Sequence, residues 1–416
     1  MYFHRILFII FTLFSFFAKA QDTLKVNIQK ADSIFLKNNF LLLASSMNIE
    51  AQKAQIIQAK IYPNPILTVD VNIYDPENNR AFHIGNTGQK FFQIEQLILL
   101  GGKRKTEIEL AKTNAKIAEL EFQQLLRQLK FRLHSNLFAI GQLQVLLVRY
   151  NEQLNLLETL LSSYEIQAQK GNISLKDVVR LKAAYLKLNN ERAILLKEYS
   201  ETQKSVQILL QTFSVVSFEF SESNISTYIQ LKTLDEIKSE AKQNRPELQI
   251  IQNNKILAEQ YLKHQKRLAV PDINVFANYD QRSGAFKNQI NAGFAIPLPF
   301  WNRNQGNIKT SQFKSKEADY NLQTMEIEMY SELQIAFLLY TQTVSEYQKA
   351  TSLYNADFET TINGMSDNFQ KRNVTIIEFI DFFEAYNDAM NELTRIKTQL
   401  VISAEQINLL TGSNIF

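Results

Sequence analysis

Long stretches without glycine or proline are the feature that most limits what this chain can fold into. Between Lys103 and Lys170 the only residue of either type is Gly141, and between Asn307 and Asn363 there is none. The whole chain has 11 glycines and 7 prolines in 416 residues. Because these residues are the usual helix breakers, each stretch predicts a very long helix. A helix of about 65 residues would extend about 100 Å, far beyond the helices of ordinary globular domains.

The breaker-containing motifs occur twice. Pro63 has a counterpart in Pro271, and each follows a helical stretch and precedes an alternating segment. The other motif pairs lie at offsets of roughly 200 residues and comprise 101–104 with 302–306 and 171–174 with 372–375. The chain is therefore predicted to be a duplicated unit, each copy ordered helix, strand, strand, long helix, tight turn, helix.

Shorter helices are expected at about 28–61, 174–211, 234–269 and 375–410. One helix start is predicted with Asn244 as the cap, Pro246 in the first turn and Glu247 reaching back. Two shorter helices placed end to end match one long helix in length, so extended antiparallel coiled coils are expected. The predicted fold class is mainly α with a small β part.

The N-terminus has the pattern of a secretory signal peptide. A basic start at residues 1–5 precedes an apolar run at 6–17 and the cleavage sequence Ala-Lys-Ala at 18–20. A short membrane anchor is the alternative interpretation, and no later segment approaches 18 consecutive apolar residues. The predicted organisation is a signal peptide at 1–20, a first repeat at 21–212, an insert at 213–232 and a second repeat at 233–416.

Two β-hairpins are predicted, at about 66–98 and 272–297. Their strands at 67–74, 90–97, 273–280 and 289–296 alternate apolar residues with Thr, Asp, Asn or Gln, although Phe276 interrupts a polar side. Hairpins of this kind either cover a core in a soluble protein or form part of a transmembrane barrel. Four strands cannot enclose a polar lumen, and an open edge cannot lie in lipid. The barrel interpretation therefore requires several subunits, and three would give twelve strands.

Four motifs in a fixed order resemble those of one known family. They are Pro-Asn-Pro at 63–65, Gln96 leading to Gly-Gly-Lys-Arg at 101–104, Pro-Leu-Pro-Phe at 297–300 and Arg-Asn-Gln-Gly at 303–306. On this duplicated frame the chain resembles the TolC-type outer-membrane factors, the exit ducts of tripartite efflux pumps and type I secretion systems. The motifs are most similar to those of the CusC/CzcC metal-efflux branch.

The resemblance implies a homotrimer. Its twelve-stranded barrel would lie in the outer membrane of a Gram-negative bacterium, in contact with outer-membrane lipid, and its helices would form a periplasmic tunnel. The implied partners are a periplasmic adaptor (membrane fusion) protein and an inner-membrane pump such as an RND transporter. The insert at 213–232, which is strand-like at Phe218, Glu219 and Phe220, would belong to an equatorial collar.

The resemblance also places adaptor contacts at the two helical turns. The matching residues are Gly171, Asn172, Ile173, Ser174, Leu175, Arg372, Asn373, Val374 and Thr375. Gly171 adopts positive φ at low cost, whereas Arg372 does not, so the second turn is expected to shift by one residue, to Asn373. The alternative is that these are ordinary turn residues.

Acidic residues just beyond the turns match the periplasmic aperture of the family. They are Asp177 in the first copy and Glu378 and Asp381 in the second. Rings of carboxylates in a narrow pore favour cations. The alternative is that these are solvated acids favoured by the helix dipole. The basic gate residue of the family is absent, since Val374 occupies its place.

No pattern in the sequence predicts catalysis, a cofactor or a metal site. Cysteine is absent, and His83, His134 and His264 lack the spacing of metal ligands. A formal net charge of +3 gives no electrostatic reason to expect a nucleic-acid partner.

The sequence therefore predicts a passive outer-membrane channel of a tripartite efflux system, with metal cations as a possible substrate. The alternatives are a type I secretion duct and an exported coiled-coil structural or adhesive protein without a pore.

Overall fold

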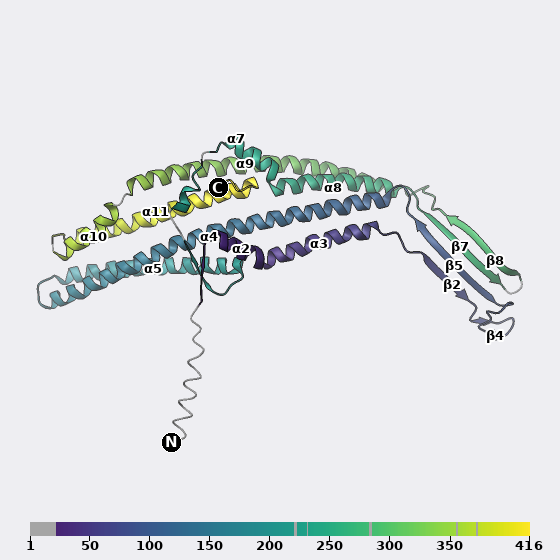
Figure 1. The fold of residues 1–416 in the computed structure, drawn as a ribbon, viewed down its shortest axis with the longest axis horizontal. Coiled ribbons are helices and arrows are strands. Elements are labelled where there is room, and N and C mark those ends of the chain that lie inside the picture. The colour runs from purple at the N-terminus through teal and green to yellow at the C-terminus, as the bar shows by residue number, and fades with distance from the viewer. Residues whose placement is uncertain (1–21, 220–222, 231, 283–284, 355–356, 372) are drawn as a thin grey trace, which may run out of the picture. The chain divides into compact units, whose positions relative to one another are not determined.

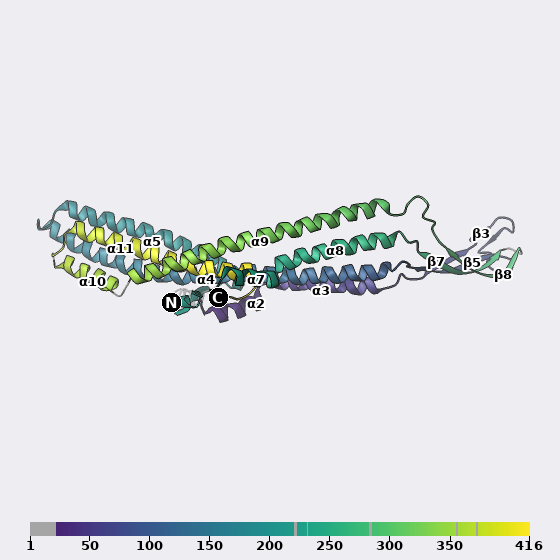
Figure 2. The ribbon, with the colours of Figure 1, turned by 90° about the horizontal axis from the view of Figure 1, so that it is seen from above.

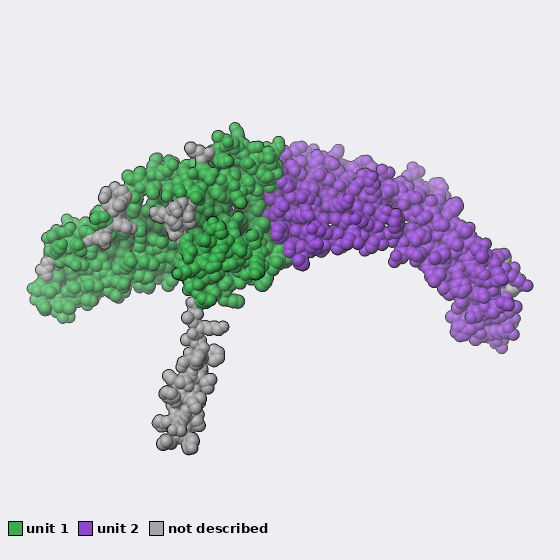
Figure 3. Space-filling view, viewed as in Figure 1, with its two compact units in different colours: residues 1–43, 124–245, 329–416 green, residues 44–123, 246–328 purple. Residues whose placement is uncertain are grey.

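The computed structural model describes residues 22–219, 223–230, 232–282, 285–354, 357–371 and 373–416. The predicted signal peptide at 1–20 lies outside these residues. The chain is mainly helical with a small β part, and it divides into two compact units (Figures 1 and 3). Unit 1 comprises residues 1–43, 124–245 and 329–416, and unit 2 comprises residues 44–123 and 246–328.

Unit 1 holds the helical turns and the C-terminal end of the chain. Its elements are β1 (Thr23–Val26), α2 (Ile28–Asn38), the second part of α4 (Lys103–Gln169), α5 (Leu175–Leu210), β6 (Val215–Phe218), α6 (Ser223–Ser226), α7 (Leu234–Asn244), the second part of α9 (Gln305–Leu353), α10 (Asp357–Gln370) and α11 (Ile376–Thr411).

Unit 2 holds the sheet and the helices that lead into it. Its elements are most of α3 (Phe40–Lys60), β2 (Ile66–Val71), β3 (Tyr74–Asp75), β4 (Arg80–Ala81), β5 (Gln89–Ile98), the first part of α4, α8 (Pro246–Leu268), β7 (Ile273–Arg282), β8 (Phe286–Ala295) and the first part of α9.

The first long helix is confirmed, and the second is not. α4 runs for 67 residues without interruption. The second stretch is divided, because α9 ends at Leu353 and α10 begins at Asp357. The absence of glycine and proline thus permits a continuous helix but does not enforce one.

Two of the predicted shorter helices are also divided. Asn39 separates α2 from α3, since its side-chain oxygen accepts the N–H groups of Leu41 and Leu42 and so caps the second helix. Arg245 separates α7 from α8 with an extended ψ of 114°, the conformation favoured before a proline. The prediction of Asn244 as the cap is therefore wrong, while Pro246 occupies the first turn as expected.

The two predicted hairpins are confirmed, and they join into one sheet. Its strands are all antiparallel in the order β2-β5-β7-β8. The register aligns Val69 with Phe92, Phe92 with Tyr279 and Tyr279 with Ile290. Because paired residues share a face, the alternating apolar residues of all four strands lie on one side of the sheet.

Phe276, which interrupts the polar side of its strand, has a structural explanation. It pairs with Gly293, and a Cβ atom at Gly293 would lie 2.7 Å from the Phe276 ring. The glycine therefore leaves room for the ring to lie across the neighbouring strand.

The Gly-Gly-Lys-Arg motif forms the junction between β5 and α4. Gly101 has a φ of +69°, and a Cβ atom there would lie 2.9 Å from Val270. Lys103 is buried and its Nζ lies 2.7 Å from Asp272 Oδ2, while the Arg104 guanidinium stacks 3.8 Å from the centre of the Tyr62 ring. The motif thus fixes the strand-to-helix turn within unit 2.

The insert carries a strand, but of the predicted strand-like residues only Phe218 belongs to it, and its partner was not expected. β6 pairs in parallel with β1, and the Glu219 N–H donates to Val26 O at 2.9 Å. Phe220, the third residue of the predicted strand-like segment, lies outside the described residues. Among the residues that are described, no helix is both long and apolar enough to cross a bilayer.

Candidate functional site

The two helical turns that the sequence identifies lie at the same end of unit 1 (Figures 1 and 2). Aromatic rings from three helices hold them together. Phe369 of α10 stacks on Phe379 of α11 with centroids 4.3 Å apart and on Tyr164 of α4 with centroids 5.5 Å apart. These rings belong to a buried core whose other members include Leu157, Leu181 and Phe383. The packing brings together turns that are about 200 residues apart in the chain.

The first turn closes α4 with a Schellman motif. Gly171 has a φ of +76°, its N–H donates to Ala168 O at 3.0 Å, and the Asn172 N–H donates to Gln167 O at 2.9 Å. Ser174 then caps α5, its hydroxyl accepting the Lys176 N–H at 3.3 Å. The sequence Gly-Asn-Ile-Ser therefore ends one helix and starts the next within four residues.

The second turn closes with the equivalent bond. The Asn373 N–H donates to Asn368 O at 2.9 Å, as Asn172 does in the first turn. The expected shift by one residue is thus not seen in this bond. Arg372 lies outside the described residues. Thr375 caps α11 through a complete capping box with Glu378.

Residues from both turns line a shallow cleft of about 410 Å³. Five predicted contact residues border it, namely Asn172, Ile173, Ser174, Val374 and Thr375. Gly171, Leu175 and Asn373 are exposed beside it, and the Leu175 side chain is 73% exposed. The cleft combines apolar rims with the charged groups of Lys176, Asp177 and Arg180. It can therefore receive a partner that has both apolar and charged side chains.

The three predicted aperture acids have different surroundings. Asp177 is half-buried and lines the cleft, whereas Glu378 and Asp381 are exposed on α11. Glu378 Oε2 accepts the Thr375 N–H at 2.8 Å and its hydroxyl at 2.7 Å. These two bonds, the backbone bond foremost, lower the pKa of Glu378 and keep it charged. Glu378 thus has a capping role that is independent of any pore.

Polar links between the helical pairs were missed by the sequence analysis. Tyr150 of α4 is buried, and its hydroxyl lies 2.8 Å from Asn391 Nδ2 of α11 and 3.3 Å from Glu191 Oε2 of α5. Lys187 of α5 forms an ion pair at 2.9 Å with Glu384 of α11. The sequence does contain one indication of these links, because Tyr150 interrupts an otherwise aliphatic row on α4 and a buried hydroxyl usually requires hydrogen-bond partners.

Within the described part of the chain, no group of three or more His, Asp or Glu side chains is arranged to hold a metal ion. His83 lies 2.7 Å from Asp75 Oδ2 in the loop of the first hairpin, and His264 lies 2.7 Å from the Thr106 hydroxyl.

Sequence comparison relates the chain to outer-membrane efflux proteins. The profile of the family described as Outer membrane efflux protein matches residues 237–413. The cobalt-zinc-cadmium resistance protein CzcC of Cupriavidus metallidurans is 25% identical over 298 residues, which cover 68% of this chain and 65% of CzcC.

Solved structures share the fold. CusC superimposes with a TM-score of 0.75 at 15% identity, covering 93% of this chain and 92% of CusC. The CmeC outer membrane channel of Campylobacter jejuni gives a TM-score of 0.74 at 13% identity, covering 93% of this chain and 86% of CmeC. The resemblance to the TolC-type outer-membrane factors, on the side of CusC and CzcC, is thereby confirmed. Proteins of this family are channels rather than enzymes, in agreement with the prediction that the chain is not an enzyme.

Proposed function

We propose that the chain is one subunit of a homotrimeric efflux channel in the outer membrane of a Gram-negative bacterium. Residues 1–20 would direct export, the repeats at 21–212 and 233–416 would build the channel, and the insert at 213–232 would form an equatorial collar. The channel would pass substrate passively out of the periplasm when docked to an adaptor and an inner-membrane pump of the RND type. The observation that carries the proposal is the sheet of unit 2, which exposes an apolar face and, among the residues described, has two unpaired edges.

The apolar face is too exposed for a sheet that covers a core. Leu67 is 68% exposed, Ile94 55%, Phe294 70% and Ile290 81%. These residues come from β2, β5 and β8 and share one side through the register. A continuous exposed apolar face of this kind is what a transmembrane strand presents to lipid.

The free edges support closure by further copies of the chain. Within the described residues, β2 and β8 each pair on one side only. In the order β2-β5-β7-β8 with every pair antiparallel, β8 runs opposite to β2, so β8 of one copy can pair with β2 of the next. Two copies would give eight strands, whose interior side chains fill, whereas three give twelve and leave a lumen.

The opposite face of the sheet suits a water-filled lumen. Thr68, Gln93, Asn278 and Asn291 form one polar rung across the four strands. Asn291 Nδ2 donates to Asn278 Oδ1 at 3.0 Å. Polar side chains that bond to one another and to water are expected inside a barrel rather than against lipid.

The proposal also assigns roles to the two helical turns and to the three acidic residues beyond them. The cleft between the turns would receive the adaptor through Gly171, Asn172, Ile173, Ser174, Leu175, Arg372, Asn373, Val374 and Thr375. Asp177, Glu378 and Asp381 would form the periplasmic aperture. The name of CzcC supports metal cations as the substrate. A secreted polypeptide, as in a type I secretion duct, is the alternative.

Fractionation followed by planar-bilayer conductance tests the proposal. The processed protein should remain with the outer membrane, require detergent for extraction, migrate as a trimer and give discrete conductance steps. A monomer in the soluble extract would instead identify an exported coiled-coil protein without a pore and would overturn the proposal.

A further inference from the structure

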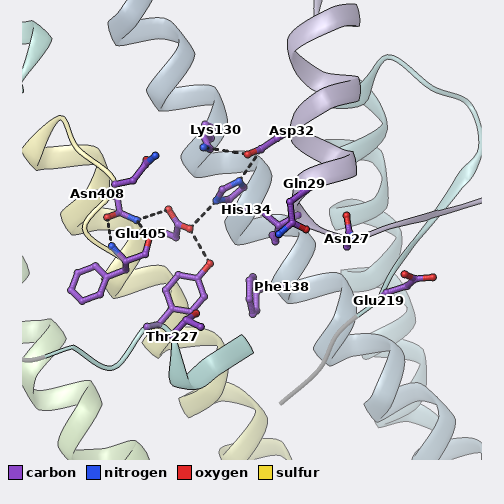
Figure 4. Close-up of a pocket in the computed structure, with 14 residues that line it drawn as sticks. Asn27, Gln29, Asp32, Lys130, His134, Phe138, Glu219, Thr227, Glu405 and Asn408 are labelled. Carbon is purple, nitrogen blue, oxygen red and sulfur yellow. Dashed lines mark hydrogen bonds and ion pairs between the residues drawn. The ribbon is translucent and has the colours of Figure 1, made fainter. Parts of the chain in front are cut away.

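A buried histidine in unit 1 lies between two carboxylates from different helices (Figure 4). His134 of α4 has Nδ1 2.8 Å from Glu405 Oε1 of α11 and Nε2 2.9 Å from Asp32 Oδ1 of α2. The side chains of His134 and Glu405 are only 7% and 8% exposed, and that of Asp32 is 22% exposed. Elements distant in sequence are thus joined through one imidazole ring.

Each carboxylate also has partners of its own. Lys130 Nζ lies 3.2 Å from Asp32 Oδ2. The Tyr228 hydroxyl donates to Glu405 Oε1 at 3.1 Å, and Asn408 Nδ2 donates to Glu405 Oε2 at 3.2 Å.

A cavity of about 580 Å³ adjoins the cluster, and Glu219 lines it together with the cluster residues. The charged and titratable groups around His134 are therefore Asp32 from α2, Lys130 from its own helix, Tyr228 after α6, Glu219 after β6 and Glu405 from α11.

The arrangement requires a positively charged ring. A neutral imidazole has one N–H and can donate to only one carboxylate, so the other would face a nitrogen lone pair. Burial disfavours the charged ring, but the bonds to Asp32 and Glu405 outweigh it and raise the pKa of His134 to about 9. The same bonds lower the pKa values of Asp32 and Glu405 against the opposing effect of burial.

We propose that Asp32, His134 and Glu405 form a proton-operated latch that fastens α2 to α4 and α11 and opens when His134 loses its proton. The bond to Asp32 is the one that breaks. Glu405 is more buried than Asp32, so leaving its charge opposite an unprotonated nitrogen would cost more free energy. The remaining N–H therefore stays bonded to Glu405. Asp32 keeps its ion pair with Lys130 and borders the cavity, where water can solvate its carboxylate.

The direction of the pH dependence follows from the raised pKa. The stabilisation from His134 is complete below pH 6.5, the ordinary histidine value, and is lost as the pH rises through about 9. The latch involves residues of unit 1 alone and does not depend on the proposed channel function.

Amide hydrogen exchange of the detergent-purified, full-length protein tests the latch. Protection of α2 (Ile28–Asn38), corrected for the intrinsic exchange rate, should fall roughly tenfold or more between pH 7 and pH 10. Protection of α5 (Leu175–Leu210), which carries no residue of the cluster, should change little. Constant protection of α2 up to pH 10, or an equal loss in α5, would overturn the proposal.

Variants separate the latch from simple unfolding. His134→Gln places a neutral amide that donates from its nitrogen but only accepts at its oxygen, so it cannot donate on both sides as the charged ring does. Helix α2 should therefore be weakly protected already at pH 7 and remain so at pH 10. His264→Gln is the matched control, since His264 is also buried but bonds to the Thr106 hydroxyl and not to a carboxylate. It should retain the transition of the wild type.

Asp32→Asn keeps the proposal testable if His134→Gln does not fold. This variant leaves Glu405 as the only carboxylate bonded to His134, and one N–H is enough for it. The loss of α2 protection near pH 9 should then disappear. A transition that persists in Asp32→Asn would show that the latch is not its cause.

Discussion

Glu378 combines two roles that a single substitution can separate. As the capping-box partner of Thr375 it needs only an acceptor for the N–H and hydroxyl of that residue. As part of a cation-selective aperture it needs its negative charge. Glutamine keeps the acceptor and removes the charge, whereas alanine removes both.

We expect the double variant Glu378→Gln, Asp381→Asn to lower the thermal midpoint less than Glu378→Ala does and to lose part of the cation preference of the wild type. Glu378→Ala should lower both the cation preference and the thermal midpoint, because the capping box of α11 then loses the bonds between Glu378 and Thr375. The measurements are the reversal potential across a planar bilayer under a salt gradient and a thermal melt. An unchanged reversal potential in the double variant would reject the aperture role.

Gly171 tests how strictly the first turn depends on backbone conformation. Its φ is +76°, and a Cβ atom there would meet nothing within 4 Å, so strain in a variant would come from the backbone alone. Gly171→Val should destabilise the turn by about 1–2 kcal/mol, and Gly171→Asn by less, because asparagine tolerates positive φ. Denaturant titration measures the difference. Equal stability of the two variants would contradict this account of the turn.

At the scale of elements, the sequence predicts what local patterns encode. α4 and the strands follow from missing breakers and from alternation, and both are found close to the expected bounds. The breaks at Asn39 and after Leu353 and the strand β1 were not foreseen. Asn39 ends a helix partly because its Nδ2 donates to Leu209 O, and β1 exists because β6 pairs with it. Such long-range partners leave no local signal.

The same limit applies to the candidate site. The turn residues themselves were predicted, because glycine at positive φ and hydroxyl caps have local signatures. The cleft between the turns was not, since it depends on Phe369 and Phe379 stacking between α10 and α11 and on Tyr164 of α4. The buried His134 cluster likewise joins Asp32 to Glu405, which the sequence alone does not bring together.

Asn39→Ala should destabilise the junction of α2 and α3 by about 1–3 kcal/mol, since it removes the cap of α3 and leaves the buried Leu209 carbonyl without this donor. Asn38→Ala is the matched control, because Asn38 is the exposed last residue of α2 and should change stability by less than about 0.5 kcal/mol. Denaturant titration of the solubilised protein measures both. Similar effects of the two substitutions would contradict the role of Asn39.

At the scale of the whole molecule, the common orientation of the two hairpins is the decisive property. Each hairpin has an apolar side in isolation, but only the pairing of β5 with β7 determines that both sides face the same way. With β5 or β7 displaced by one residue, one apolar side would turn toward the polar side of the other hairpin. The observed register places the apolar rows of both hairpins on one face, and the other face carries the polar rung of Thr68, Gln93, Asn278 and Asn291. A barrel wall requires such a difference between its two faces.

Gln93 and Ile94 are neighbours on β5 and point to opposite faces, so they provide a matched test of which face meets lipid. Ile94→Lys would place a charge in hydrocarbon at a cost of about 2–4 kcal/mol per subunit near the midplane. A trimer carries this cost three times, and we therefore expect greatly reduced outer-membrane assembly. Gln93→Lys would place the same charge in the lumen, where water solvates it, and should assemble normally.

The amount of heat-modifiable trimer in outer-membrane fractions measures both variants. If Gln93→Lys abolished assembly and Ile94→Lys did not, the faces would be assigned the wrong way round; if neither had an effect, the sheet would not lie in a membrane.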